Sequence, residues 1–155
     1  MPPSITDTAA GQPLAEFFNH HHYKLMCTAN ARGEPSIALM GTPRLQADGT
    51  LAFELSDPVS TTLDNIRENK AVVFMAYVPG ERARDFRGAR LYAEVTEILS
   101  DGPRLDAIRQ DIRERFGEDK AAELQATVTC AITRVRPIVD RGQRWDAPPF
   151  ADAGG

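Results

Sequence analysis

Histidine is scarce in this 155-residue sequence, which contains 3 His, and all of them stand together at His20–His22. A Ser–His–Asp set needs a histidine base, and an HExxH zinc site needs two histidines four residues apart, so neither arrangement is available. Adjacent histidines on a regular helix cannot all face one metal ion. The run is therefore interpreted as a polar helix end, and the sequence gives little support to acid–base hydrolase chemistry.

Cysteine is also scarce: Cys27 and Cys130 lie far apart, without metal-type spacing. Both fall in strand-like runs and are interpreted as buried, reduced thiols of a cytoplasmic protein rather than as a disulfide. No apolar run is long enough to cross a bilayer. The first 18 residues lack a basic region followed by an apolar one, so no secretion signal is visible. We expect a cytoplasmic location and no membrane partner.

Positive charge does not dominate, since 18 Lys and Arg stand against 22 Asp and Glu and give a net charge of −4. A nucleic-acid-binding domain usually shows a basic face, so nucleic acid is not an expected partner. The sequence also has no GxGxxG, no Gly-Lys-Ser/Thr phosphate loop, no GxSxG and no CxxC motif. The sequence therefore lacks most of the common motifs for nucleotide binding, hydrolysis and thiol redox chemistry.

The length and a hydrophobic content of 42% fit one domain with a real core. Residues 1–12 are expected to be flexible, residues 13–140 to form the domain, and residues 141–155 to form a tail that has no core pattern. Alternation and β-forming residues predict six strands, at 24–30, 35–42, 51–55, 71–78, 88–99 and 127–135. The strand at 71–78, AVVFMAYV, is apolar throughout and is expected to be buried on both faces.

Helices are predicted over 13–22 and after Asp101-Gly102-Pro103, with a further turn or two over 120–125. The second helix has an apolar stripe at Leu105, Ile108, Ile112 and Phe116, and Gly117 is expected to end or bend it. Most connections between the strands are too short for parallel crossovers. The sequence therefore predicts a mainly β fold with helices, an antiparallel sheet closed or nearly closed into a small barrel.

The chain is organised around residues 51–69, a strand that breaks at Ser56-Asp57-Pro58 and resumes as a short helix. Ser60, Thr61 and Thr62 lie at the start of this helix, and Asn65 lies one turn further on. A helix N-terminus flanked by hydroxyl groups can hold a phosphate. The same residues are also ordinary N-caps. Both interpretations stay open from these residues alone.

Three stretches together resemble the FMN-binding split-barrel family related to pyridoxamine 5'-phosphate oxidase. They are MCTANARGEPSIALMGTP, DGTLAFELSDPVSTTLDNIRENKAVVFMAY and FRGARLYAEVTEI with the helix that follows it. The likeness lies in their order and spacing and covers about residues 24–135. It implies a dimeric six-stranded antiparallel split β-barrel and favours the phosphate site over plain capping.

The resemblance also implies a cofactor, FMN, held at the interface of a homodimer. The flavin would lie along a strand end formed by Leu39, Met40, Gly41 and Thr42. The phosphate would lie where the next strand meets its helix, at Ser56, Asp57, Ser60, Thr61, Thr62 and Asn65. Many members of the family have lysine where this chain has Thr61, so a cation must come from elsewhere. Arg90 is preferred for that role over Arg67 and Arg87.

Trp145 in the tail either covers the flavin of the neighbouring subunit, as a C-terminal aromatic often does in the family, or packs the tail onto the barrel. The resemblance implies an FMN-dependent oxidoreductase that passes electrons or hydride between a nicotinamide cofactor and a small molecule. The alternatives are a non-enzymatic electron carrier with a protein redox partner, a relative that binds deazaflavin or haem, and a barrel that has lost its cofactor. The arginine- and histidine-bearing substrate signature of the oxidase itself is not evident after Val135.

Overall fold

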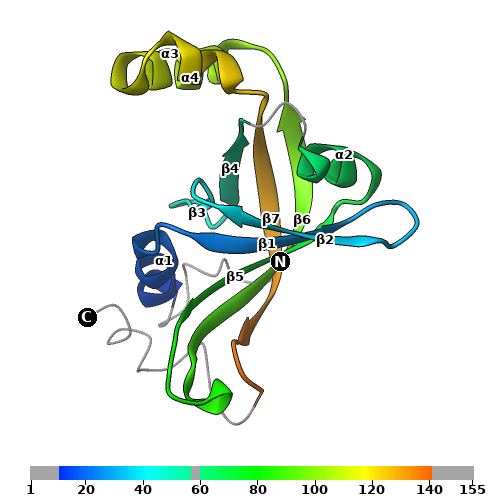
Figure 1. Cartoon of the computed structure of the whole chain (residues 1–155), viewed down its shortest axis with the longest axis vertical. Helices are drawn as coiled ribbons and strands as arrows, with labels where there is room; N and C mark the ends of the chain where they lie inside the picture. The colour runs from blue at the N-terminus through cyan, green and yellow to red at the C-terminus, as the bar shows by residue number, and fades with distance from the viewer. Residues whose placement is uncertain (1–10, 57–59, 141–155) are drawn as a thin grey trace.

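The computed structural model describes residues 11–56 and 60–140 (Figure 1). Its helices are α1 (Gly11–His20), α2 (Thr61–Glu68), α3 (Pro103–Phe116) and α4 (Glu118–Glu123), with a 3₁₀ turn, η2, at Ala83–Asp85. Its strands are β1 (Lys24–Ala29), β2 (Pro35–Met40), β3 (Arg44–Leu45), β4 (Leu51–Leu55), β5 (Ala71–Val78), β6 (Arg87–Leu99) and β7 (Ala126–Pro137). Within these residues, no helix combines the length and the apolar character that crossing a membrane requires.

The strands form one curled sheet in the order β2-β1-β5-β6-β7-β4-β3, and every neighbouring pair is antiparallel. The mainly β, antiparallel prediction is confirmed, and the curled half-barrel is consistent with a split barrel. The count of six strands is wrong because β3, which follows Pro43, has only two residues and is too short to show alternation. The expected closure of the sheet is not found within the described chain, where β2 and β3 are the two edges.

One hydrophobic core fills the concave side of the sheet. Phe53 of β4 and Phe74 of β5 pack edge to face, with ring centroids 5.6 Å apart. Leu14 and Phe18 of α1 and Ile66 of α2 are fully buried against the same cluster. Burial of such large apolar side chains is the main stabilising term of the fold. The helices α1 and α2 are therefore fixed relative to the strands that line the site described below.

The prediction that β5 is buried on both faces is wrong for the single chain. Val72, Phe74 and Ala76 are buried, whereas Val73 and Met75 on the other face are only half-buried. The reason is that in the described chain this outer face of the sheet has no helix packed over it. An apolar strand that is half-exposed in this way indicates a surface that another molecule can cover.

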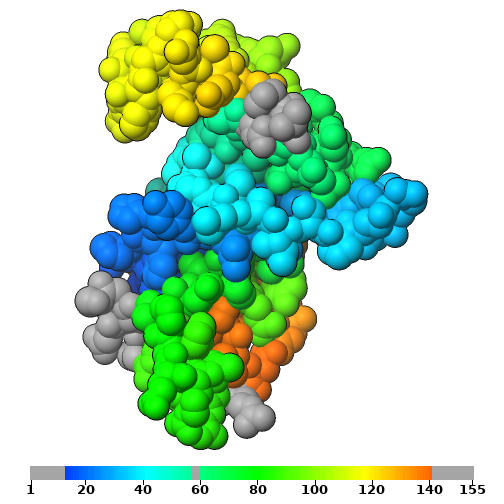
Figure 2. Space-filling view, viewed as in Figure 1, coloured from blue at the N-terminus to red at the C-terminus, as the bar shows by residue number. Residues whose placement is uncertain are grey.

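The helix pair α3–α4 stands at one end of the molecule, apart from the body of the barrel (Figure 2, yellow). The predicted apolar stripe of α3 is only partly buried: Leu105 is fully buried, Ile108 and Ile112 are half-buried, and Phe116 is 69% exposed. The stripe is thus fully buried only in the first turn, because α3 extends past the sheet. Gly117 ends the helix with φ +97°, as predicted.

Both cysteines are free thiols. Cys130 is fully buried, and this burial raises the pKa of its thiol to about 12, so it stays protonated at neutral pH. Cys27 lies on the outer face of β1 and is only half-buried. The prediction of two buried thiols therefore holds for Cys130 alone.

Candidate functional site

A cavity of about 470 Å³ brings together three separate parts of the chain: the end of β2, the end of β4 and the start of α2. A volume of this size is typical of a small-molecule site. It is lined by Ser36, Ile37, Ala38, Leu39, Met40, Gly41, Thr42, Glu54, Leu55, Ser56, Ser60, Thr61 and Thr62. The predicted flavin strand and most of the predicted phosphate residues therefore border one space.

The start of α2 supplies the polar wall of this cavity. Ser60 is the N-cap of α2, with extended backbone (φ −68°, ψ 116°), and its side chain makes no capping hydrogen bond. Thr61 is exposed and Thr62 is buried, both in the first turn. The first N–H groups of a helix have no partner within the helix and carry its positive dipole end. Hydroxyl and N–H donors thus converge where an anion would bind.

Asn65 does not line the cavity but anchors the helix that does. Its Nδ2 donates a hydrogen bond to Thr28 Oγ1 of β1 over 3.0 Å, and both side chains are buried. This contact fixes α2 against the sheet from its inner side. The structure places Asn65 as a positioning residue for the helix N-terminus, and direct binding by Asn65 stays a prediction.

Arg90 lies on β6 and is not brought to the cavity within one chain. Its Nε donates to the Pro137 carbonyl over 3.0 Å, and its Nη2 lies 2.8 Å from Asp140 Oδ1. Arg136 contacts the same carboxylate, and the two guanidinium groups hold the pKa of Asp140 below its usual range. Among the described residues, none that lines the cavity is a lysine or an arginine. Two further predicted residues, Asp57 and Trp145, lie outside the described residues.

Sequence reasoning missed an ion pair at the rim of the cavity. Arg44 of β3 contacts both carboxylate oxygens of Glu54 on β4, each at 2.9 Å. The Thr42 hydroxyl donates to the Glu54 carbonyl over 2.9 Å and orders the chain between the two strands. A signal was present, because a glutamate inside the otherwise apolar strand LAFEL needs a cationic partner when it is buried.

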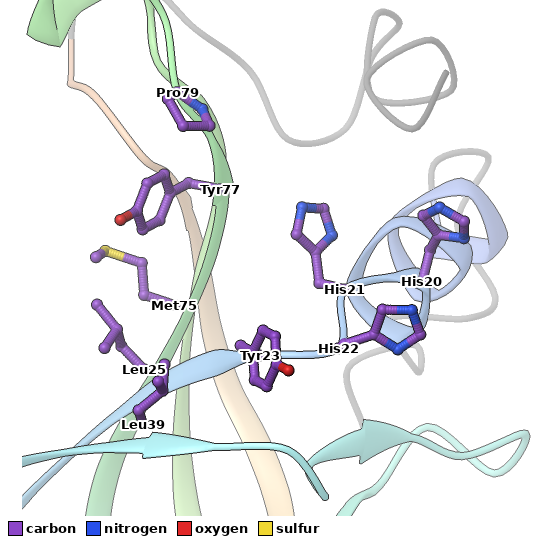
Figure 3. Close-up of a pocket in the computed structure, with 9 residues that line it drawn as sticks. All are labelled: His20, His21, His22, Tyr23, Leu25, Leu39, Met75, Tyr77 and Pro79. Atoms are coloured by element: carbon purple, nitrogen blue, oxygen red, sulfur yellow. The ribbon is translucent and has the colours of Figure 1, made fainter.

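A second cavity of about 460 Å³ lies between the histidine run and the outer face of the sheet (Figure 3). Strand residues Leu25, Leu39, Met75 and Tyr77 line it, together with His21, which directly follows α1. His21 Nδ1 lies 2.8 Å from the Phe17 carbonyl, so Nδ1 carries the proton and Nε2 of the neutral ring keeps its lone pair. In the described part of the chain, no three His, Cys, Asp or Glu residues form a metal-type group.

The family model of pyridoxamine 5'-phosphate oxidase matches residues 11–138. The chain therefore belongs to this family, and the resemblance read from the three stretches is confirmed. The comparison with curated protein sequences found no match.

Solved proteins with the same fold are named for different ligands. An FMN-binding protein from Syntrophomonas wolfei subsp. wolfei is 17% identical, with TM-score 0.62, over 83% of this chain and 85% of that one. An F420 reductase is 18% identical, with TM-score 0.57, over 78% and 94%. HutZ, the haem storage protein from Vibrio cholerae, is 17% identical, with TM-score 0.58, over 78% and 89%. At these identities the likeness shows the fold alone.

Proposed function

We propose that this chain binds FMN in the cavity between β2, β4 and α2 and acts as a flavin-dependent oxidoreductase. The observation that carries the proposal is that Leu39–Thr42 and Ser60–Thr62, which are about 20 residues apart in sequence, line one cavity. The family match and an FMN-binding neighbour support it. The F420 reductase and the haem storage protein among the structural neighbours make deazaflavin and haem the competing ligands.

The residues present fit the phosphate end of FMN. The Ser60 hydroxyl is not used as a cap, and it adjoins the N–H groups of the first turn of α2. Thr61 and Thr62 add hydroxyl groups on the same wall. Hydrogen bonds to a charged group contribute about 1.5–3 kcal/mol each before compensation. FMN, when bound, supplies hydride or single-electron transfer. The chain's own residues hold the phosphate, orient the ring along Leu39–Thr42 and exclude water.

The phosphate dianion needs a positive partner, and the described residues that line the cavity do not include a lysine or an arginine. We assign this role to Arg90 of a second copy, because a homodimer would bring a basic strand from outside. Arg90 is already oriented by Asp140 and the Pro137 carbonyl. Removal of Arg90 should weaken FMN binding and leave riboflavin binding unchanged, since riboflavin has no phosphate.

The outer face of the sheet is the surface on which the second copy would pack. Ile37 and Leu39 of β2 are each 68% exposed, although both are large and apolar. They pair in register with Cys27 and Leu25 of β1, and those residues pair with Val73 and Met75 of β5. Neighbours across a sheet share a face, so these side chains form one continuous apolar patch. A homodimer would cover this patch.

For the reaction, we propose electron or hydride transfer between a nicotinamide cofactor and a small molecule in the cytoplasm. The second candidate is a non-enzymatic electron carrier, in which a protein redox partner takes the place of the small molecule. No side chain of the described site is assigned as an acid or base. The two candidates differ in one measurement: an enzyme oxidises NADH or NADPH in the presence of FMN, whereas a carrier does so only with a partner reductase.

The binding proposal is tested by titrating the protein separately with FMN, deazaflavin F420 and haem. We expect FMN fluorescence to be quenched at one FMN per chain, and the emission of Trp145, the single tryptophan of the sequence, to fall with it. Truncation after Arg141 should weaken binding only about tenfold if the tail acts as a lid. If the protein is saturated by F420 and does not respond to FMN, the FMN proposal is contradicted and deazaflavin is the ligand.

Haem has its own supporting observation in the His21 cavity. The hydrogen bond from Nδ1 to Phe17 leaves Nε2 as the ligating atom, and Leu25, Met75 and Tyr77 line the same cavity. An axial histidine with an apolar wall is a common haem environment. A Soret band that develops on haem addition and is lost in His21→Ala, with His22→Ala as control, would favour this candidate.

A further inference from the structure

A third cavity, of about 610 Å³, lies between α3 and the strands β3 and β4. It shares Thr42, Glu54 and Ser56 with the proposed FMN cavity, so the two spaces adjoin. Its remaining lining residues are Arg44, Ala107, Ile108, Asp111, Ile112 and Arg115. The proposed FMN site uses none of these six side chains, and the volume is within the range of small-molecule sites.

The floor of this cavity presents a cation. The side chain of Glu54 is only 9% exposed, whereas the Arg44 guanidinium that covers it is 41% exposed. Within the described chain, the bonds to Glu54 and to the Thr42 carbonyl use three of the five N–H donors of Arg44. The guanidinium is therefore the more exposed member of this ion pair in the cavity.

The wall formed by α3 has an apolar part and a charged end. Ile108 and Ile112 are four residues apart, lie on one face of the helix and are half-buried. Arg115, one turn further on, is 69% exposed and has its Nε 3.2 Å from Asp111 Oδ1. The guanidinium groups of Arg44 and Arg115 and the apolar side chains of Ile108 and Ile112 thus line the same cavity.

We propose that this cavity binds a small organic carboxylate with an apolar body. The carboxylate would accept hydrogen bonds from Arg44 and Arg115, and the apolar body would contact Ile108 and Ile112. Arginine suits this role because its N–H groups match a carboxylate geometrically. Because the cavity adjoins the flavin site, such a compound is the substrate class of the oxidoreductase. That assignment rests on the proposed function, whereas binding itself does not.

The experiment is a calorimetric titration of the full chain with 4-phenylbutyrate, and with 4-phenylbutanol as the uncharged match. Both are run with the protein alone and after saturation with FMN. We expect the carboxylate to bind at least about tenfold more tightly than the alcohol. Arg115→Gln should remove most of that difference, and Ile112→Trp, which fills the cavity, should abolish binding of both compounds. Arg115 is 69% exposed and Ile112 is only half-buried, so both variants should fold.

Arg104→Gln is the matched control, since Arg104 is on the same helix but pairs with Glu97 and does not line the cavity. Equal binding of acid and alcohol, an equal loss in Arg104→Gln and Arg115→Gln, or no binding at about 10 mM would each overturn the proposal. The two claims fail separately. If the protein takes up FMN but does not bind the carboxylate, only the proposed substrate site is contradicted. If it binds the carboxylate but does not take up FMN, the proposed flavin function is contradicted and the carboxylate site is retained.

Discussion

The Asn65 side-chain amide and the Thr28 hydroxyl form a buried 3.0 Å hydrogen bond that joins α2 to β1. The helix N-terminus lines the cavity, but its position is set one turn away, at Asn65. Fixing of binding groups by residues behind them is what keeps a site preorganised. This contact therefore links the stability of the barrel to the geometry of the proposed phosphate site.

Asn65→Ala should lower the free energy of unfolding by about 1–3 kcal/mol, because the buried Thr28 hydroxyl loses its partner. Chemical denaturation checks this. The double variant Asn65→Ala/Thr28→Val should recover part of the loss, since it removes the unsatisfied hydroxyl. Full additivity of the two single changes would show that the hydrogen bond does not couple α2 to β1.

Lys24 makes stability depend on pH in the alkaline range. It is 3% exposed, and burial, then the nearby Arg44, lowers its pKa to about 8. In the unfolded chain its pKa is about 10.4, so between these values the unfolded state binds more protons and stability rises with pH. Lys24→Met should be more stable than the parent at pH 7, by about 1–2 kcal/mol after loss of the contact with the Phe18 ring.

The advantage of Lys24→Met should shrink between about pH 8 and pH 10.5. Denaturation of both proteins across this range gives the difference directly, and the contributions of other titrating groups cancel in it. A difference that is constant with pH would mean that Lys24 titrates normally in the folded chain.

Gly88 is required for the close approach of β6 to β5. Its φ is +154°, and a Cβ atom there would lie 2.1 Å from the Ala76 carbonyl oxygen. Gly88→Ala should therefore cost more than about 3 kcal/mol in thermal or chemical unfolding. Gly41→Ala is the control, because its Cβ would meet only the His22 carbonyl oxygen, at 3.5 Å. Equal stability of both variants would contradict the register of β5 and β6.

Cys27 should report on dimerisation. It lies in the apolar patch and is half-buried in one chain, whereas Cys130 is fully buried with its pKa raised to about 12. A thiol reagent should modify Cys27 at least about tenfold more slowly in concentrated protein than after dilution below the dimer dissociation constant. In denatured protein both thiols should react, which gives the total number of thiols per chain as a reference. A dimer through this face would be excluded if the rate of Cys27 modification did not depend on protein concentration and light scattering gave the mass of a monomer at every concentration.

The sequence predicted well wherever the signal was local. Alternation located six of the seven strands. The helix start at Ser60 was also correct. What the sequence could not show depends on tertiary context. The apolar sequence of β5 predicts a strand that is buried on both faces. Only the packing of the described chain shows that no helix covers its outer face.

The cavities illustrate the same limit. Arg44 and Glu54 are ten residues apart, and nothing in their spacing indicates a bidentate pair, although a glutamate in an apolar strand called for a cation. The α3 wall of this cavity depends on how the α3–α4 segment, between β6 and β7, packs relative to β3 and β4. Sequence alone located the polar cluster at Ser60–Thr62 but not the third cavity, which adjoins the proposed FMN cavity.

The central claim is that the FMN phosphate binds at the start of α2, and the ratio of riboflavin to FMN dissociation constants tests it most directly. The parent protein should bind FMN at least about tenfold more tightly than riboflavin. Ser60→Ala/Thr62→Ala should weaken FMN binding at least about tenfold and leave riboflavin binding unchanged, so that the ratio falls toward one. Ser100→Ala, outside the cavity, should keep the ratio of the parent. A ratio that is unaltered in the double variant, or riboflavin binding as tightly as FMN to the parent, would contradict a phosphate site at this helix.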